Sequence, residues 1–418
     1  MARITQYALP ALAGLAMPAF AHYIPAIDTP VSVDASAVMT WRSASLIGDY
    51  EFWQIPGTQM GGHAWPARKG LEIDEWNLGL GYRIDQNLFA VAKLGAHAGG
   101  KDDHGGVELE HAYVGWVCCE EKGPWVAELG RMSARFSPGV GGHAADRLFS
   151  ETPLAVDVFF GRYFHDQGLR LWWHETSGVT LGVEIWRGEA FPATASEDGG
   201  AWDLFGRYAW QGQRWTLEAG GWFYHAAAES RADHRYGGGH QHVPVAPPGQ
   251  TATLFPDTRY TGDTDIAGLH GRLAYRFNRD WQWAVEAEWM HTTLEGVVHD
   301  SIGRQADLQA TQHGGWVQPS LTWRQQTVAL RWEQLTTDND LTGAAAPQLA
   351  TDSGLANPDG HAPQRIAAVW FWQWRPGLAL RAEVTRDQTL SDTEQRFALG
   401  VVWKQRIWPR GDSFHRGH

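Results

Sequence analysis

The segment AGLHGRLAYRFNRDWQWAVEAEW, residues 267–289, decides the fold because it alternates apolar and polar side chains on both sides of a short turn. Small and apolar residues hold the odd positions from Ala267 to Phe277, and again from Trp281 to Trp289. Most of the even positions carry polar or charged side chains. Successive side chains of a β-strand point to opposite faces, so the segment predicts a β-hairpin with one apolar and one charged face.

The charges of this hairpin also predict its register. If Phe277 pairs with Trp281 across the turn at residues 278–280, groups of complementary charge face each other on the two strands. A slip by one residue would move every charge to the apolar face, which disfavours other registers. The predicted facing pairs are Arg272 with Glu286 and His270 with Glu288.

The rest of the chain repeats this unit and predicts sixteen antiparallel strands, including Trp202–Trp210, Trp215–Phe223, Gly315–Trp323 and Val328–Trp332. The connections at one end are short turns, whereas most at the other end are long and rich in glycine and proline. This asymmetry is typical of outer-membrane barrels, which have short periplasmic turns and longer extracellular loops. Aromatic residues at the short-turn end predict a girdle at one membrane interface: Tyr82, Trp116, Trp125, Trp173, Trp210, Trp215, Phe277, Trp281, Trp323 and Trp374.

The composition is compatible with such a barrel. The chain has 418 residues, of which 24 are Trp, and its mean hydropathy is −0.37. A transmembrane barrel is polar at every second residue, so its average hydropathy resembles that of a soluble protein. The alternative is a secreted β-sandwich, which also alternates but has no reason to build an aromatic girdle or one-sided loops. A closed barrel further leaves no unpaired backbone edge in lipid, so we expect an all-β transmembrane barrel.

The N-terminus predicts export. Arg3 precedes an apolar run from Tyr7 to Phe20 that ends in a small-x-small site, as in a secretory signal peptide. The expected organisation is a signal peptide at residues 1–21, a barrel at 22–408 in the outer membrane of a Gram-negative bacterium, and a tail at 409–418.

Two further features limit the classes of function. The net charge of −13 disfavours nucleic acid as a partner. The only cysteines, Cys118 and Cys119, are adjacent, and neighbouring cysteines rarely pair, so we expect them to be unpaired residues at a strand end. Alternation brings no Ser/His/acid arrangement together, so we expect no enzymatic activity.

If the apolar face meets lipid, the charged face lines the lumen. Charges of both signs are tolerated there only if the wall is wet or its charges pair, and a barrel of this size leaves an aqueous channel. Arg207 is expected opposite Glu218. A strongly selective pore usually has one dominant sign at its constriction, so this wall favours weak selectivity. The predicted lumen residues include Arg170, Arg207, Arg272, Arg331, Arg381, Glu75, Glu128, Glu184, Glu218, Glu286, Glu288, Glu333 and Glu383.

The long connection at residues 130–168 is the candidate constriction loop. It contains Arg131, Arg135 and Arg147, which we predict at the constriction together with the lumen residues Arg170, Arg207, Arg272, Glu286 and Glu288. Its segment Leu154–Phe160 has a strand-like pattern that does not fit the up-and-down strand count. We therefore expect this segment to be loop structure folded into or against the pore mouth.

This region resembles Gram-negative outer-membrane porins, most closely the phosphate-selective type. The resemblance is carried by the GR-x4-FSP run at Gly130–Pro138, the strand start Gly168–Leu171 and the sixteen-strand layout. It implies a third loop that narrows the pore, basic residues that attract anions, and association into homotrimers. The sequence departs from the family in lacking an arginine ladder and in continuing past Trp408 into a tail.

A histidine-rich stretch lies in the predicted extracellular loop at residues 225–263. In an extended segment His240 and His242 project to the same side, so their imidazoles can share Zn²⁺ or another transition metal, with Asp233 or His234 completing the site. The alternative is a polar surface loop in a His-rich chain. Two functions follow: a porin for passive diffusion of small hydrophilic solutes or ions, or an outer-membrane protein that captures transition metal.

Overall fold

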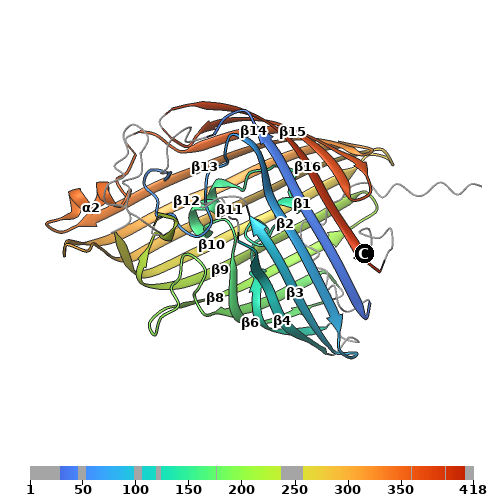
Figure 1. Ribbon diagram of the computed structural model, residues 1–418, viewed down its shortest axis with the longest axis horizontal. Coiled ribbons are helices and arrows are strands. Elements are labelled where there is room, and N and C mark those ends of the chain that lie inside the picture. Colours follow the sequence, from blue (N-terminus) through green and yellow to red (C-terminus); the bar gives the residue numbers. More distant parts are fainter. Residues whose placement is uncertain are drawn as a thin grey trace, which may run out of the picture.

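The computed structural model describes residues 29–45, 53–97, 106–118, 124–175, 177–236, 258–358, 360–390 and 392–409. They form one closed antiparallel barrel in which each strand pairs with its neighbours in sequence and β1 pairs with β16 (Figure 1). The predicted fold is therefore confirmed. The strands are β1 (Val31–Arg42), β2 (Gly70–Arg83), β3 (Leu88–His97), β4 (Glu108–Cys118), β5 (Trp125–Ser133), β6 (His165–His174), β7 (Val179–Trp186), β8 (Gly200–Gln211), β9 (Trp215–Ala232), β10 (Arg259–Arg276), β11 (Trp281–His299), β12 (Gln305–Trp323), β13 (Gln326–Thr342), β14 (Gln364–Arg375), β15 (Leu378–Gln388) and β16 (Glu394–Trp408).

The hairpin of β10 and β11 has the register that its charges predict. The Phe277 N–H donates to the Trp281 carbonyl at 3.0 Å, and the two facing pairs form as expected. Arg272 Nε donates to Glu286 Oε1 at 2.9 Å. The predicted position of Arg207 opposite Glu218 is wrong, because Gln211 pairs with Thr216 at the turn and shifts the hairpin by two residues. The resulting pairs are Arg207 with Gly220, Ala209 with Glu218, and Glu218 with Arg272 on the next strand.

The outer face of the barrel carries the predicted aromatic girdle. Trp125 faces Trp173 and Trp281 faces Trp323 across neighbouring strands, with ring centroids 6.3 and 6.1 Å apart. Trp289, nearer the other end of β11, is also 46% exposed. The apolar outer face between Trp281 and Trp289 is about nine residues long, which matches the length that a tilted strand needs to cross a bilayer.

Beyond this apolar band the strands continue, and the polarity of their two faces inverts. On β9 and β10, His225 and Asp265 are joined by a hydrogen bond of 2.7 Å, and Asp265 is 45% exposed at its side chain. Tyr224 and Ile266 point inward from the same pair of strands and are fully buried. The predicted loop at 225–263 is therefore too long: β9 ends at Ala232 and β10 begins at Arg259.

Three connections contain short helices within the described residues, and one of these is the 3-10 helix η3 (His234–Tyr236) that follows β9. The loop between β5 and β6, residues 134–164 and called L3 from here on, contains the 3-10 helix η2 (Ala144–Asp146) and the α-helix α1 (Leu154–Phe160), whereas α2 (Ala346–Asp352) joins β13 to β14. Leu154–Phe160 belongs to this loop, as expected, but it is not extended as its strand-like pattern would suggest: it forms a helix, buried along its whole length, that is followed by Gly161 (φ +63°). Tertiary contacts here override the strand preference of the valines.

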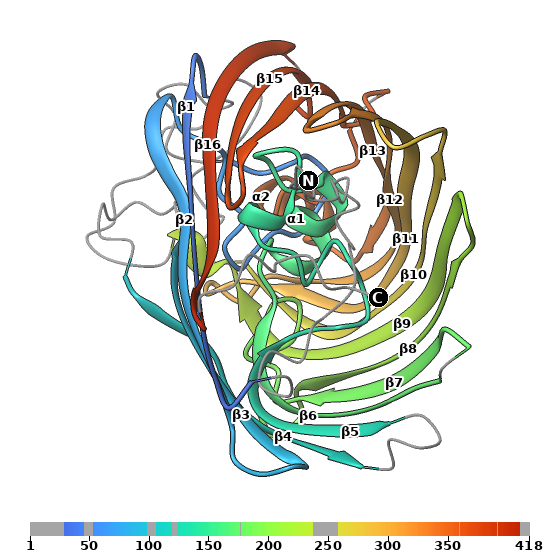
Figure 2. The same cartoon turned by 90° about the vertical axis from the view of Figure 1, so that its right-hand side faces the viewer.

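Figure 2 views the barrel along its axis and places α1 inside the ring of strands, as expected for a loop folded into the pore. Among the described helices, none has the length and apolar content that crossing a membrane requires. At the end of β4, Cys118 is disulfide-bonded, so the expectation of unpaired cysteines is wrong.

Candidate pore constriction

L3 crosses the barrel interior and packs against the connection between β1 and β2. Phe136 and Phe160 of L3 share a buried core with Ile55 of that connection and with Tyr224 of the wall. The two segments approach so closely that the His63 N–H donates to the Gly161 carbonyl at 2.8 Å. Two chain segments, together with side chains from the wall, therefore occupy part of the interior at this level.

Five wall glutamates hold L3 across the lumen, and we call them the glutamate ring. All five side chains are buried, and they come from β2, β7, β11, β13 and β15, which lie around the whole barrel. Hydrogen bonds to carboxylates are stronger than those between neutral groups, so each contact is an effective anchor. The contacts are Ala144 N–H to Glu75 (3.0 Å), Arg135 N–H to Glu184 (3.1 Å), Ser137 Oγ–H to Glu288 (2.6 Å), Leu154 N–H to Glu333 (2.6 Å) and Ser150 N–H to Glu383 (2.8 Å).

Wall arginines compensate most of this negative charge. Arg381 Nε lies 2.9 Å from Glu383 on the same strand, and Arg331 Nε lies 2.8 Å from Glu333. Arg170 pairs with both Glu184 and Glu128. A buried carboxylate is costly unless it is paired and hydrogen-bonded. Glu184, Glu333 and Glu383 each have an arginine on one side and L3 on the other.

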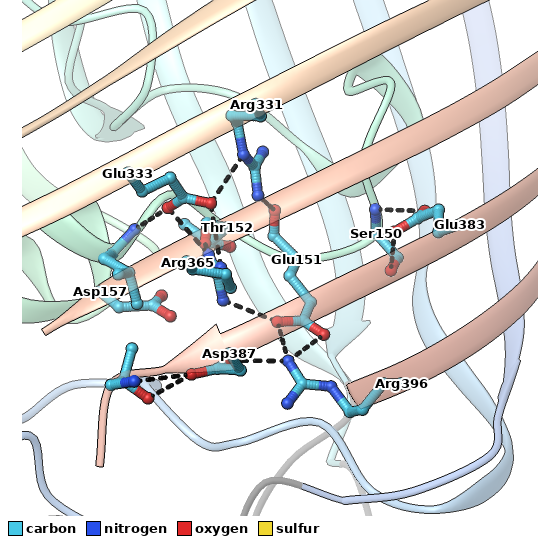
Figure 3. A network of polar contacts seen from close by, with 12 residues as sticks. Ser150, Glu151, Thr152, Asp157, Arg331, Glu333, Arg365, Glu383, Asp387 and Arg396 are labelled. Carbon is cyan, nitrogen blue, oxygen red and sulfur yellow. Dashed lines mark hydrogen bonds and ion pairs between the residues drawn. The ribbon is translucent and has the colours of Figure 1, made fainter. Parts of the chain in front are cut away.

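L3 also has a carboxylate of its own that binds arginines of the wall. Glu151 of L3 accepts hydrogen bonds from Arg365 of β14 at 2.6 Å and from Arg396 of β16 at 2.9 Å (Figure 3). Arg396 also bonds to Asp387 at 3.0 Å, and Arg365 bonds to Glu333, so one network joins the loop to four strands. Burial alone would raise the pKa of Glu151, but the charges of Arg396 and Arg365 outweigh burial and hold this pKa below its ordinary value.

A charged cavity lies beside this network, between L3, the connection after β1, and strands β1, β2, β14 and β16. Its lining combines both signs of charge in equal number. Such a lining stabilises water and small polar solutes without excluding either sign of ion. The charged lining residues are Arg42, Arg162, Arg365, Arg396, Glu72, Asp74, Glu151 and Asp157.

The arginines predicted at the constriction separate into different environments. The guanidinium of Arg135 lies 4.0 Å from the centre of the Trp172 ring, and Arg147 binds within L3 to Thr152 Oγ1 at 2.6 Å and to the Gly142 carbonyl. Arg131 instead bonds to Glu189 and to the Leu109 carbonyl at the rim of the wall. Of the three, only Arg135 and Arg147 therefore belong to the loop that crosses the lumen.

The predicted wall residues divide in a similar way. Glu288 holds L3, and Arg170 donates to the carbonyl of Ser133, the last residue of β5 before L3. Arg272 and Glu286 pair with each other, and Gln318 donates to Glu286 at 3.2 Å. The Arg207 guanidinium lies 5.2 Å from the ring of Phe205 on the same strand.

Of the predicted metal ligands, two lie within the described residues. Both oxygens of Asp233 accept hydrogen bonds from Arg235, at 2.9 and 2.7 Å. His234 begins a short 3-10 helix, His234–Tyr236, directly after Asp233. His240 and His242 lie outside the residues that the structure describes.

Sequence reasoning missed three residues of the central network as site residues: Glu151, Arg365 and Arg396. The two arginines stand one position before Ile366 and Phe397, which are exposed apolar residues of the outer face. Extending the alternation by one residue would have placed both on the lumen face. The docking role of Glu151 has no local signal, because it depends on where a loop of 31 residues folds.

Comparison with known proteins supports the fold. No family model and no curated protein matches the chain. Among solved structures, the outer membrane protein OmpT of Vibrio cholerae in its trimer form has a TM-score of 0.52 and 9% identity, covering 90% of this chain and 100% of that chain. OprB of Pseudomonas putida (TM-score 0.49, 9% identity) covers 90% and 94%, and the anion-selective porin from Comamonas acidovorans (0.45, 11%) covers 90% and 98%.

The likeness to OmpT and the closed sixteen-strand barrel establish the class of architecture. The chain is an outer-membrane β-barrel of a Gram-negative bacterium, as its sequence predicts. Identities near 10% indicate the fold only, because one fold can have many functions.

Proposed function

We propose that this protein is a porin that admits small hydrophilic solutes and ions by passive diffusion, without enzymatic activity. The observation that carries the proposal is the docking of L3 inside the barrel by the glutamate ring. A loop anchored at five points around the lumen narrows the channel and holds that narrowing at a fixed size. No step of solute passage then requires energy or a moving domain.

The charges support weak selectivity. The cavity beside Glu151 has four arginines and four acidic residues, and the arginines of the wall are paired with carboxylates. A selective pore presents unpaired charge of one sign, because only unpaired charge attracts one ion over the other. The proposal therefore favours general passage over the phosphate selectivity that the family resemblance implies.

The test is conductance in planar bilayers with potassium chloride at unequal concentrations on the two sides. The purified protein is expected to give stable channels whose reversal potential lies close to zero, since neither ion is strongly excluded. A strongly shifted reversal potential would refute weak selectivity while leaving the pore intact. Correctly folded protein without any conductance would refute the porin proposal itself.

The protein is further proposed to assemble as a homotrimer in outer-membrane lipid, as the OmpT structure is in trimer form. Light scattering of the detergent-solubilised protein tests this assembly. A protein mass of three chains supports it, and a mass of one chain, 46.5 kDa, refutes it.

A further inference from the structure

Three histidines that come from separate segments meet at the junction of L3 with the wall. His111 lies in β4, His165 is the first residue of β6, and His143 lies in L3 immediately before η2. One ring nitrogen of each lies within 4.8 Å of the others, and all three residues are half-buried. We propose that His111, His143 and His165 form a binding site for a transition-metal dication such as Zn²⁺, Ni²⁺ or Cu²⁺.

Local irregularities and the glutamate ring bring these imidazoles together. Along β4, Lys93 pairs with His111 while Leu94 pairs with Leu109, so Glu110 is an extra residue in a β-bulge. Bulges re-aim side chains, and this one lets both Glu110 and His111 interact with side chains inside the barrel. His143 is positioned by the next residue of L3, Ala144, whose N–H donates to Glu75.

Oxygen atoms lie beside two of the three rings, as in known metal sites. A histidine that binds metal through one nitrogen usually engages its other nitrogen with a carboxylate or another oxygen, which fixes the ring. Nδ1 of His143 lies 3.3 Å from Glu75 Oε1, and Nε2 of His111 lies 2.7 Å from Ser133 Oγ. Both rings therefore have the oxygen contact that orients a metal-binding imidazole.

A cation already stands beside this cluster. The Lys93 ammonium lies 2.7 Å from His143 Nε2 and 3.0 Å from Glu110 Oε2. In the metal-free protein the Lys93 ammonium therefore interacts with both the His143 lone pair and the Glu110 carboxylate. A metal ion at His143 Nε2 displaces the ammonium, which keeps Glu110 as its partner.

The cluster fits an open three-histidine site. Tetrahedral zinc with bonds of about 2.1 Å places its ligand nitrogens about 3.4 Å apart, so the longest separation of 4.8 Å must shorten on binding. His143 can supply this movement because it belongs to a loop, whereas His111 and His165 belong to strands. Water takes the fourth position, and imidazole ligands favour zinc, copper and nickel over calcium and magnesium.

The site would tie L3 to the wall at β4 and β6, on either side of the strand from which L3 leaves. This consequence rests on the proposed channel function: a metal-bound loop fluctuates less, so the channel current should become quieter. Metal binding itself does not depend on whether the barrel conducts. The two can therefore be tested separately.

The binding test titrates the purified full-length protein in detergent with Co²⁺, following its visible absorbance, and with Zn²⁺ by calorimetry. Wild type is expected to bind one Co²⁺ per chain at this site with the absorption of a tetrahedral nitrogen site. The variants His143→Gln and His165→Gln should each weaken binding at least tenfold, and Lys93→Gln should tighten it because a competing charge is removed. Heat-modified mobility on gels confirms that each variant is folded.

The control is the pair His291 and His313, whose Nδ1 atoms lie 3.1 Å apart on β11 and β12. Replacing both by Gln should leave the Co²⁺ spectrum unchanged. The proposal is overturned if the His143→Gln/His165→Gln variant binds like wild type, or if the control variant loses the site instead. In bilayers, about 10 µM Zn²⁺ should reduce the current noise of wild type but not of the His143→Gln/His165→Gln variant. If wild type binds metal and its noise does not change, the predicted effect of metal on L3 is overturned. If the folded protein gives no conductance, the porin proposal is overturned.

Discussion

Replacing Glu151 by glutamine removes one negative charge from the point where L3 meets β14 and β16. The carboxylate receives charge-assisted hydrogen bonds from two arginines: one from Arg365, and two from one nitrogen of Arg396 that contacts both oxygens. Glutamine has almost the same shape but offers one neutral acceptor oxygen and turns an amide N–H₂ toward a guanidinium. The substitution therefore weakens both contacts without leaving a cavity.

The size of the effect follows from the remaining partners. Hydrogen bonds to charged groups contribute about 1.5–3 kcal/mol each. In the variant, Arg365 still bonds to Glu333 and Arg396 still bonds to Asp387. We expect Glu151→Gln to make the docking of L3 less favourable by about 2–4 kcal/mol. This is less than the cost of leaving both buried arginines without any carboxylate partner. At about 1.4 kcal/mol per factor of ten, the undocked population rises by roughly 30- to 700-fold.

Native-state hydrogen exchange of peptides from L3 measures this population directly, because local opening exposes the loop amides. The matched control is Glu189→Gln. Glu189 also contacts two arginines, at 3.1 and 3.0 Å, but its side chain is 30% exposed, so we expect almost no change there. Exchange in Glu151→Gln within threefold of wild type would refute the claim that this network holds the loop.

The same carboxylate predicts a pH dependence. Because the pKa of Glu151 is held below its ordinary value of 4.5, its contribution to docking is complete above that pH and is lost as the pH falls through the lowered pKa. Channel-current noise in wild type should therefore rise as the pH drops below about 4.5. Glu151→Gln should already be noisy at neutral pH and change less on acidification. Equal acid responses of the two proteins would contradict this assignment.

Three further predictions concern the wall. Gly268→Ala should lower the thermal midpoint of the barrel, because a Cβ there would lie 2.1 Å from the Trp222 ring. The control Gly79→Ala, whose Cβ would have no atom nearer than 3.8 Å, should leave the midpoint unchanged. Equal midpoints for the two variants would contradict this prediction. Leu273→Arg on the lipid face should cost about 2–4 kcal/mol in a urea refolding assay, and a neutral result would place that face away from lipid. Arg272→Gln should leave Glu286 in excess and move the reversal potential toward cation preference, which an unchanged potential would disprove.

The alternation of side chains predicted the barrel and the apolar band, but it could not reveal the full length of the strands. It ended β9 at Phe223 and β13 at Trp332, where the outer face stops being apolar, whereas these strands continue to Ala232 and Thr342. Above the membrane the outer face is polar and the inner face is apolar. A pattern defined by lipid contact is lost at that point, although the hydrogen-bonded ladder continues.

For the candidate site, too, alternation predicted which face a residue lies on but not which residues come into contact. Alternation placed Glu75, Glu333 and Glu383 on the lumen face, and the long connection at residues 130–168 indicated a constriction loop, although β5 continues to Ser133 and β6 begins at His165. Which L3 group meets which carboxylate depends on contacts between residues 49 to 233 positions apart. Such pairs leave no periodic signal in one sequence. The same limit hid the His111, His143 and His165 cluster, whose members belong to three separate segments.

The central claim is that L3, docked by carboxylate contacts, sets the width of a passive channel. Swelling of proteoliposomes in neutral sugars of increasing size measures that width directly. Wild type is expected to admit small sugars and exclude larger ones. A variant in which Glu151, Glu333 and Glu383 are all glutamine should admit larger sugars, with heat-modified gel mobility confirming that its barrel is folded. Identical size limits for the two proteins, or no swelling with folded wild type, would contradict the account.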